Sequence, residues 1–254
     1  MKVIMCGYNW AGCSALDQLI NKNHEVYVYT HKTRNSVADL EGLCIKKHVD
    51  YTTERINVTN IPFTPDIICS IYYRYLFDKS IIALSDGKIF NLHPSLLPDY
   101  RGCSSITWAM INGEKYCGYT WHYIDEGCDT GNIIIQKKIK IEEYDTQLTL
   151  YNRVMFEAMR DFQAAFDRVI HGDCGEQQIG KGRYYKRGCP KAGIIDYDTM
   201  TEDEIERFIR AMVYPPYKSA QVDGKFVETY CDYLSYRKQR AGACVLNSED
   251  IGTN

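Results

Sequence analysis

Short apolar runs of strand length alternate with segments of helical periodicity along most of the chain, and this alternation limits the fold more than any other feature. Lys2–Cys6 indicates a buried strand, GYNWAG (residues 7–12) a turn, Ser14–Lys22 a helix and His24–Thr30 a second strand. Strand–helix alternation predicts an α/β fold, a Rossmann-like and mostly parallel sheet flanked by helices. Further strands are expected at Asp66–Tyr73, Lys88–His93, Cys117–Ile124 and Asn132–Ile141, with helices at Phe77–Leu84 and Ser104–Ile111.

The C-terminal part of the chain has a different pattern. Apolar residues three and four apart predict one helix over Asp145–Gly172, with Gly172 as its C-cap. A composition change near Pro190 predicts a boundary between residues 1–190 and a small helix-plus-strands unit, 191–254. That unit begins with an acidic helix at residues 201–213. The alternating stretch FVETYCDYLSY (residues 226–236) then indicates a strand whose edge or apolar face needs cover, so we expect a homodimer.

Charge and cysteine content restrict the class of function. The formal net charge of −3 and the pI near 6.1 disfavour a nucleic-acid partner and favour a small substrate. The 11 cysteines are scattered and odd in number, which predicts free thiols and a cytoplasmic location. We find no metal-type cysteine spacing and no apolar run long enough for a signal or a membrane span, so we expect neither a metal nor a membrane partner.

The GYNWAG segment has the strand–turn–helix context of a dinucleotide fingerprint, but its glycines lack the GxGxxG spacing, which weakens an NAD interpretation. Two alternatives stay open at this point. The loop offers backbone N–H groups to an anion, with Asn9 and Trp10 adding polar and stacking contacts. Otherwise, Gly7 and Gly12 only permit a tight turn.

The stretch FNLHPSLLPDYRG (residues 90–102) ends a strand with an amide and an imidazole. Asn91 and His93 are two residues apart and therefore share a face, at the strand end where open α/β sheets bind ligands. A second loop, in YIDEGCDTGNIII, supplies Asp125, Glu126 and Asp129. Without a recognisable nucleophile elbow, this set suits direct transfer between two bound substrates: Asn91 and protonated His93 stabilise an oxyanion, while a carboxylate keeps the imidazole charged by raising its pKa.

The two motifs together, FNLHPSLLPDYRG and DEGCDTG, resemble those of N10-formyltetrahydrofolate-dependent formyltransferases over roughly residues 1–190. The resemblance implies a formyltransferase catalytic domain with Asn91, His93 and Asp129 as its catalytic residues. It also implies that N10-formyltetrahydrofolate is a co-substrate held mainly by backbone of two loops. The expected co-substrate contacts are Ile71, Tyr72, Tyr73, Arg74, Ile124, Asp125 and Gly127.

The segment RFIRAMVYPPYKSA resembles that of nucleotide-sugar N-formyltransferases. This resemblance implies formyl transfer to a nucleotide-linked dideoxy amino sugar, first of all dTDP-4-amino-4,6-dideoxyglucose, for surface polysaccharide (O-antigen, lipopolysaccharide) synthesis. Cationic side chains are expected on the diphosphate and aromatic ones on the sugar or base. The candidate substrate contacts are Asn9, Trp10, Tyr72, Arg74, Lys79, Arg101, Lys181 and Tyr217.

Other functions stay open on the sequence alone. Within the same family, the acceptor amine could belong to a dTDP-3-amino sugar, GDP-perosamine, methionyl-tRNA or glycinamide ribonucleotide. Outside it, the scaffold also suits NAD-type redox or epimerase chemistry and non-catalytic binding of folate or nucleotide. Tetrahydrofolate production that depends on an amino sugar would separate these classes.

Overall fold

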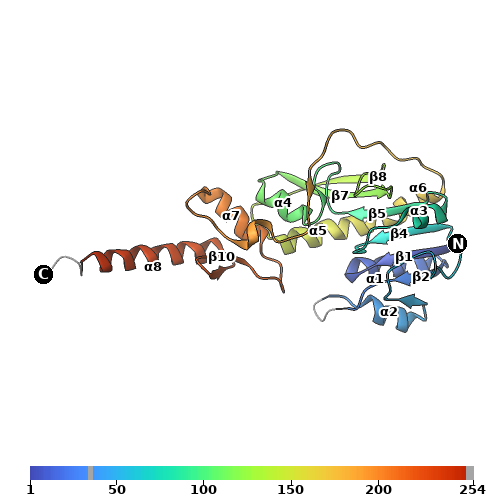
Figure 1. Cartoon of the computed structure of the whole chain (residues 1–254), viewed down its shortest axis with the longest axis horizontal. Helices are drawn as coiled ribbons and strands as arrows, with labels where there is room; N and C mark the ends of the chain where they lie inside the picture. The colour runs from blue at the N-terminus through green and yellow to red at the C-terminus, as the bar shows by residue number, and fades with distance from the viewer. Residues whose placement is uncertain (34–36, 250–254) are drawn as a thin grey trace. The chain divides into compact units, whose positions relative to one another are not determined.

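The computed structural model describes residues 1–33 and 37–249, with 241–249 as backbone only (Figure 1). The chain forms two compact units. The first comprises residues 1–105, 116–140 and 151–187, and the second comprises 106–115, 141–150 and 188–254. The domain boundary expected near Pro190 stays a prediction.

A seven-stranded sheet organises the first unit, in the order β3-β2-β1-β4-β5-β7-β8 (Figure 1). The pairs from β3 to β5 are parallel, whereas β5–β7 and β7–β8 are antiparallel. The expected mostly parallel α/β sheet is therefore confirmed. The strands are β1 Lys2–Gly7, β2 Glu25–Tyr29, β3 Tyr51–Thr52, β4 Ile67–Ile71, β5 Ile89–His93, β7 Tyr116–Tyr123 and β8 Ile133–Lys140.

Helices link the strands of this sheet along the chain, and one additional strand pair lies outside it. The pair, β6 Arg101–Gly102 with β9 Tyr184–Tyr185, ties the loop after β5 to the chain that follows the last helix of the unit. The sequence analysis missed α2 and β3 altogether. The helices up to residue 170 are α1 Asn9–Asn21, α2 Leu40–Lys47, α3 Lys79–Ile82 with a 3₁₀ turn at Ala83–Ser85, α4 Ser105–Ile111, α5 Gln147–Arg160 and α6 Phe162–Ile170. Of these, α4 from residue 106 and α5 up to residue 150 belong to the second unit.

The first helix begins earlier than expected, because GYNWAG is not a separate turn. Asn9 adopts a positive φ of 55°, and its side-chain Oδ1 accepts a hydrogen bond from the Ala11 N–H at 2.9 Å. This side-chain bond satisfies a helix N–H that has no intrahelical acceptor. Most of the glycine segment therefore belongs to the first turn of α1.

The single helix expected over Asp145–Gly172 is two helices, α5 and α6, separated at Asp161. The Asp161 carboxylate accepts hydrogen bonds from the Tyr119 hydroxyl at 2.6 Å and from Lys137 Nζ at 2.8 Å. Apolar periodicity continues through the break, which is why the sequence pattern did not reveal it. Gly172 has a φ of 79°, consistent with the expected glycine at the helix end.

Aromatic packing joins the sheet to α6. Phe90 of β5 and Trp121 of β7 both contact Phe162, with ring centroids 6.3 and 5.6 Å apart, and all three side chains are buried. Because strand residues alternate between faces, Phe90 directs its neighbour Asn91 to the opposite face of the sheet. The core therefore sets the orientation of the polar residues of β5.

The second unit contains α7 Glu202–Ala211, a hairpin of β10 Ala220–Val222 with β11 Lys225–Val227, and α8 Tyr230–Glu249. A capping box between Thr201 and Glu204 starts α7, close to where the acidic helix was expected. The last segment of this unit starts at residue 188 and begins with a 3₁₀ turn at Pro190–Gly193.

The strand expected over residues 226–236 is wrong beyond Val227, where the chain turns into α8. Thr229 Oγ1 accepts from the Asp232 N–H at 3.1 Å, and the Asp232 carboxylate accepts from the Thr229 N–H at 3.0 Å. This reciprocal bonding caps a helix, so the apolar alternation is overridden by a local start signal. The sheet-edge argument for a homodimer is lost, and the dimer itself stays a prediction.

Within the described residues, none of the helices has the length and apolar character needed to cross a membrane.

We expect Phe162→Ala to lower the free energy of unfolding by about 3–5 kcal/mol, because a buried ring is removed from the contact with Phe90 and Trp121. Urea titration followed by circular dichroism measures this change. Phe156→Ala on the preceding helix is the matched control, since 56% of Phe156 is exposed, and should cost about 1 kcal/mol or less. Equal losses in the two variants would contradict the assignment of the core.

Candidate active site

The carboxyl end of β5 presents the first two candidate residues on one face. Phe90 and Leu92 point to the aromatic core, so Asn91 and His93 project from the opposite face. His93 is only 5% exposed. Its Nε2 donates a hydrogen bond to the backbone carbonyl of Tyr100 at 2.8 Å, because a carbonyl oxygen only accepts. This bond connects the strand end to the loop that follows it.

The antiparallel neighbour β7 adds a third polar side chain, His122. In the strand register, His122 lies directly opposite Asn91, and Thr120 lies opposite His93. Directly opposed residues of an antiparallel pair point to the same face. Accordingly, Asn91 Nδ2 lies 3.1 Å from His122 Nε2. His122 is 2% exposed, and its Nδ1 lies 2.7 Å from the carbonyl oxygen of Tyr123.

The Asp129 carboxylate lies between the two imidazoles. Its Oδ2 is 3.5 Å from His93 Nδ1 and its Oδ1 is 3.6 Å from His122 Nε2. The Gly102 N–H donates to Asp129 Oδ2 at 2.8 Å. Gly102 has a φ of 86°, and a Cβ there would lie 2.3 Å from the Tyr185 carbonyl oxygen, so a side chain at this position would push the N–H donor away.

Backbone contacts hold the loop that carries Asp129. Arg101 Nε donates to the Asp129 carbonyl at 3.2 Å, and its guanidinium also donates to Gln178 Oε1 at 2.6 Å. Gln178 Nε2 in turn donates to the carbonyls of Asp129 at 2.9 Å and Gly131 at 2.8 Å. Asp129 itself has a φ of 55°. Arg101, expected as a substrate contact, is thus engaged in fixing the position of Asp129.

Burial determines the charges of this cluster. Burial alone would raise the pKa of Asp129, but His93, His122 and the Gly102 N–H reverse the effect and hold that pKa well below its usual range. Burial lowers the pKa of His93, and the opposing contributions of Asp129 and the Tyr100 carbonyl do not compensate. Asp129 does raise the His93 pKa, as expected, but burial outweighs it, so the expected net increase and the protonated resting ring are wrong. At 3.5 Å the carboxylate is too distant for a hydrogen bond that would offset desolvation.

A thiol beside the cluster is poorly suited to act as a nucleophile. Cys128 Sγ lies 3.5 Å from Asp129 Oδ2. Burial and the Asp129 charge raise the pKa of Cys128 to about 12, so the thiol stays protonated at neutral pH. The arrangement therefore favours direct transfer without a covalent cysteine intermediate.

The residues expected to contact the co-substrate occupy two separate loops. Tyr73 stacks on His31 at 5.1 Å, the Arg74 N–H donates to His31 Nε2 at 3.2 Å, and the Arg74 guanidinium lies over the ring of Tyr75. Burial, followed by the charge of Arg74, lowers the pKa of His31 to about 4. This keeps the ring neutral, so that Nε2 can accept the Arg74 N–H. The loop after β4 is therefore packed by its own aromatic side chains.

The remaining co-substrate residues have structural contacts of their own. Ile71 ends β4 and is buried, Tyr72 has a φ of 66°, and Ile124 packs against the core. Asp125 Oδ1 accepts hydrogen bonds from the Gly127 N–H at 3.0 Å and from Thr130 Oγ1 at 2.5 Å. Their roles as co-substrate contacts stay predictions.

The expected substrate residues are spread over the chain. Asn9 Nδ2 donates to the Tyr151 hydroxyl at 3.2 Å, and Lys79 pairs with Glu126 at 2.6 Å on the surface. Trp10 is 45% exposed, whereas Lys181 is exposed and Tyr217 of the second unit is 67% exposed. The structure thus places Asn91, His93, Asp129 and Arg101 together, and leaves the other ligand roles as predictions.

Sequence reasoning missed three members of the cluster: His122, the Gly102 N–H and Gln178. A histidine inside an otherwise apolar strand was the available signal for His122, since it needs a partner when buried. Nothing in the sequence pattern points to Gln178, which reaches the cluster from the loop after α6.

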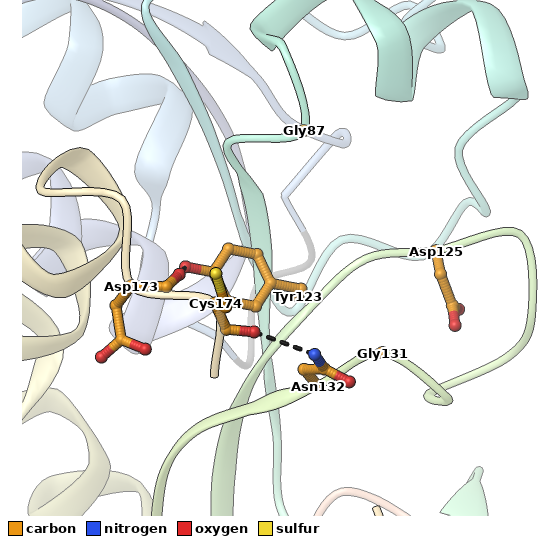
Figure 2. A pocket seen from close by; sticks show the side chains of 7 residues that line it. All are labelled: Gly87, Tyr123, Asp125, Gly131, Asn132, Asp173 and Cys174. Carbon is orange, nitrogen blue, oxygen red and sulfur yellow. Dashed lines mark hydrogen bonds between the residues drawn. The ribbon is translucent and has the colours of Figure 1, made fainter. Parts of the chain in front are cut away.

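A cavity of about 340 Å³ lies beside the segment that contains Asp125 and Gly131 (Figure 2). It is lined by Gly87, Tyr123, Asp125, Gly131, Asn132, Asp173 and Cys174, and Asn132 Nδ2 donates across it to the Cys174 carbonyl. Asn91, His93 and Asp129 do not line it. The Asp125 and Asp173 carboxylates accept hydrogen bonds from donors of the chain itself. By its lining residues, this cavity is separate from the cluster of Asn91, His93 and Asp129. Among the residues that the structure describes, no cluster of three or more His, Cys, Asp or Glu side chains is arranged to hold a metal ion.

The fold is α/β, and an amide, two imidazoles and a carboxylate meet beside the end of β5, a set of side chains suited to group-transfer chemistry. The model of the family described as formyl transferase matches residues 13–165. GDP-perosamine N-formyltransferase of Brucella melitensis is 36% identical over 234 residues, which cover 88% of this chain and 90% of the relative.

Solved structures have the same fold. An N-formyltransferase from Helicobacter canadensis, in complex with folinic acid and dTDP-3-aminofucose, superposes with a TM-score of 0.76 at 22% identity, covering 90% of this chain and 86% of that one. A 4-N formyltransferase from Francisella tularensis gives a TM-score of 0.74 at 21% identity, covering 89% and 95%. The chain belongs to the formyltransferase family and, within it, to the nucleotide-sugar N-formyltransferases.

We expect His93 to titrate below 6.5, its ordinary value, because burial of the ring outweighs the attraction of Asp129. Asp129→Asn should lower the His93 pKa further, since the negative charge that favours the protonated ring is removed. Ring resonances followed by NMR against pH measure both midpoints. Asp125→Asn, in the same loop, is the matched control and should leave the His93 midpoint unchanged; a wild-type midpoint above 6.5 would contradict this account of the charges.

Proposed function

We propose that Asn91, His93 and Asp129 transfer the formyl group of N10-formyltetrahydrofolate to the amine of a nucleotide-linked amino sugar. The observation that carries these assignments is the placement of the ionised Asp129 carboxylate against His93 and His122, opposite the Asn91 amide at the end of β5. An amide N–H stabilises an oxyanion, an imidazole moves a proton, and a carboxylate stabilises the protonated imidazole.

The proposed reaction begins with attack of the free amine on the formyl carbon. A C–N bond forms, the carbonyl π electrons move to oxygen, and an Asn91 N–H donates to that oxyanion. His93 is neutral before the reaction, since burial lowers its pKa, and its Nδ1 accepts the proton lost by the amine. The resulting imidazolium has both N–H groups directed at acceptors, the Tyr100 carbonyl and Asp129. It then gives the proton to N10 as the bond from N10 to the formyl carbon breaks.

This assignment changes the order of proton transfers expected from the sequence. A permanently protonated His93 would have no lone pair for the amine proton. A neutral ring accepts the proton first and donates it afterwards, and Asp129 lowers the energy of the intermediate charged state. Neither a metal nor a covalent enzyme intermediate enters these steps.

For the acceptor, we favour GDP-perosamine over the dTDP-4-amino-4,6-dideoxyglucose that the sequence analysis put first. The support is the relative named GDP-perosamine N-formyltransferase, which is 36% identical and covers 88% of this chain. The dTDP-linked sugar is the second candidate. A role in O-antigen synthesis follows only if one of these sugars is the acceptor.

An exposed aromatic pair supports a nucleotide ligand. Trp10 of α1 and Phe156 of α5 are 45% and 56% exposed, and their rings stack with centroids 6.4 Å apart and planes 21° apart. Trp10 directly follows Asn9 at the start of α1, where backbone N–H groups favour an anion. Stacking of the base on Trp10 would place a diphosphate beside this helix end.

We expect Asn91→Ala and His93→Ala each to lower kcat by about 10² to 10³, because each loses an interaction made in the transition state. Substrate KM should stay nearly constant. Tetrahydrofolate absorbance and the formylated sugar, measured together with either candidate acceptor, report kcat and KM. Gln18→Ala on α1 is the control away from the cluster. Near-normal turnover by either active-site variant would rule out its proposed role.

We also expect kcat/KM to be at least about tenfold higher with GDP-perosamine than with dTDP-4-amino-4,6-dideoxyglucose, corresponding to about 1.4 kcal/mol of transition-state discrimination. Both are assayed at one concentration of N10-formyltetrahydrofolate, with UDP-linked amino sugars as further acceptors. Trp10→Ala should raise KM for the preferred sugar and leave folate KM unchanged. The reverse preference would assign the dTDP-linked sugar, and no turnover with any acceptor would refute the proposed substrate class.

A further inference from the structure

We propose that His122 is a positioning residue, which holds the Asn91 carboxamide in the one orientation that offers an N–H to the formyl oxygen. The inference rests on the proposed role of Asn91 in formyl transfer. Its basis is the buried pair formed by Asn91 Nδ2 and His122 Nε2 at 3.1 Å, across the β5–β7 register.

The backbone of β7 determines which nitrogen of His122 carries hydrogen. Nδ1 lies 2.7 Å from the carbonyl oxygen of Tyr123, and a carbonyl oxygen only accepts. The hydrogen of a neutral His122 ring is therefore on Nδ1, and Nε2 presents a lone pair. The amide atom that faces this lone pair must be the Asn91 nitrogen, because the amide oxygen has no hydrogen to donate.

This pairing leaves two groups of Asn91 for the reaction. One Nδ2–H is bonded to His122, so the second Nδ2–H is available to an oxyanion. Among the contacts of the described residues, Asn91 Oδ1 has no hydrogen-bond donor within the chain and is available to an N–H of the attacking amine. If the amide turned by 180°, its oxygen would face the His122 lone pair, which is repulsive. His122 thus blocks the wrong orientation.

The neighbours of His122 are consistent with a role through Asn91 rather than direct chemistry. His122 is 2% exposed, and the groups facing its ring are Asn91, Asp129 at 3.6 Å and His93, whose ring centroid is 6.4 Å away. The closest of these contacts is the one with Asn91. A residue that only filled space would not need an acceptor atom at this position.

Three substitutions separate positioning from packing. His122→Phe keeps the ring volume and removes the acceptor, and we expect about a tenfold lower kcat with unchanged KM. His122→Gln places a side-chain carbonyl near the position of Nε2 and should recover most of the rate. His24→Phe is the matched control, because it makes the same exchange at a half-buried ring that packs on Phe166, and should leave kcat unchanged.

A double-mutant cycle tests whether His122 acts through Asn91. In the Asn91→Ala background, His122→Phe should have no further effect on kcat, because the group that it positions is gone. A full additional tenfold loss in that background, or unchanged kcat in the single variant, would overturn the proposal.

A measurement without substrate keeps this test separate from the proposed function. In ¹H–¹⁵N spectra, the Asn91 side-chain amide is assigned by its absence in Asn91→Ala. We expect one of its two protons to be shifted downfield in the wild type, to lose that shift in His122→Phe and to regain it in His122→Gln. An Asn91 amide indifferent to all three changes would refute the positioning role even if formyl transfer is confirmed, whereas the expected shifts without turnover would refute only the proposed function.

Discussion

The site depends on one buried carboxylate that stays ionised. The side chain of Asp129 is only 15% exposed, and a buried charge without partners is strongly unfavourable. The Gly102 N–H supplies a close hydrogen bond at 2.8 Å, and two imidazoles supply polar contacts on either side. The Gly102 N–H belongs to the loop after β5, and the two imidazoles belong to strands β5 and β7. The carboxylate therefore requires all three segments to be in place, and it couples the loop geometry to the strand register.

Burial disfavours the negative charge of Asp129, and it also determines whether His93 is protonated. A ring that is 5% exposed loses most of its hydration when charged, and this loss exceeds the attraction of a carboxylate 3.5 Å away. His93 is therefore neutral at pH 7 in the free enzyme. A proton that arrives from the substrate meets a carboxylate on one side of the ring and a backbone carbonyl on the other. In the proposed mechanism, these two acceptors stabilise a positive charge that appears on His93 only during the reaction.

The parts of the fold that follow from periodicity were predictable. Alternation along residues 88–93 correctly separated Phe90 and Leu92 from Asn91 and His93, because the strand repeat is strict. The parallel sheet followed from strand–helix alternation. The break at Asp161 and the helix starting at Tyr230 did not, since each depends on specific side-chain hydrogen bonds that override apolar spacing. His122 was missed because its partner Asn91 is distant in sequence, and only the antiparallel register brings the two side chains together. The neutral His93 was missed because a charge state depends on burial, which no short motif reports.

Several loops that follow strands contain a residue with a positive φ. Outside glycine, positive φ values occur at Asn9 after β1, Tyr72 after β4, Tyr100 after β5 and Asp129 after β7. Two other such residues, His48 and Asp86, end helices, where a left-handed residue is common. For a bulky residue such as Tyr100, this conformation costs about 1–3 kcal/mol and persists only where neighbouring contacts stabilise it. The Tyr100 carbonyl accepts from His93 and the Asp129 carboxylate accepts from Gly102. The interactions that orient the reactive groups are thus the ones that hold the strained backbone, so loosening the site would also release the loops.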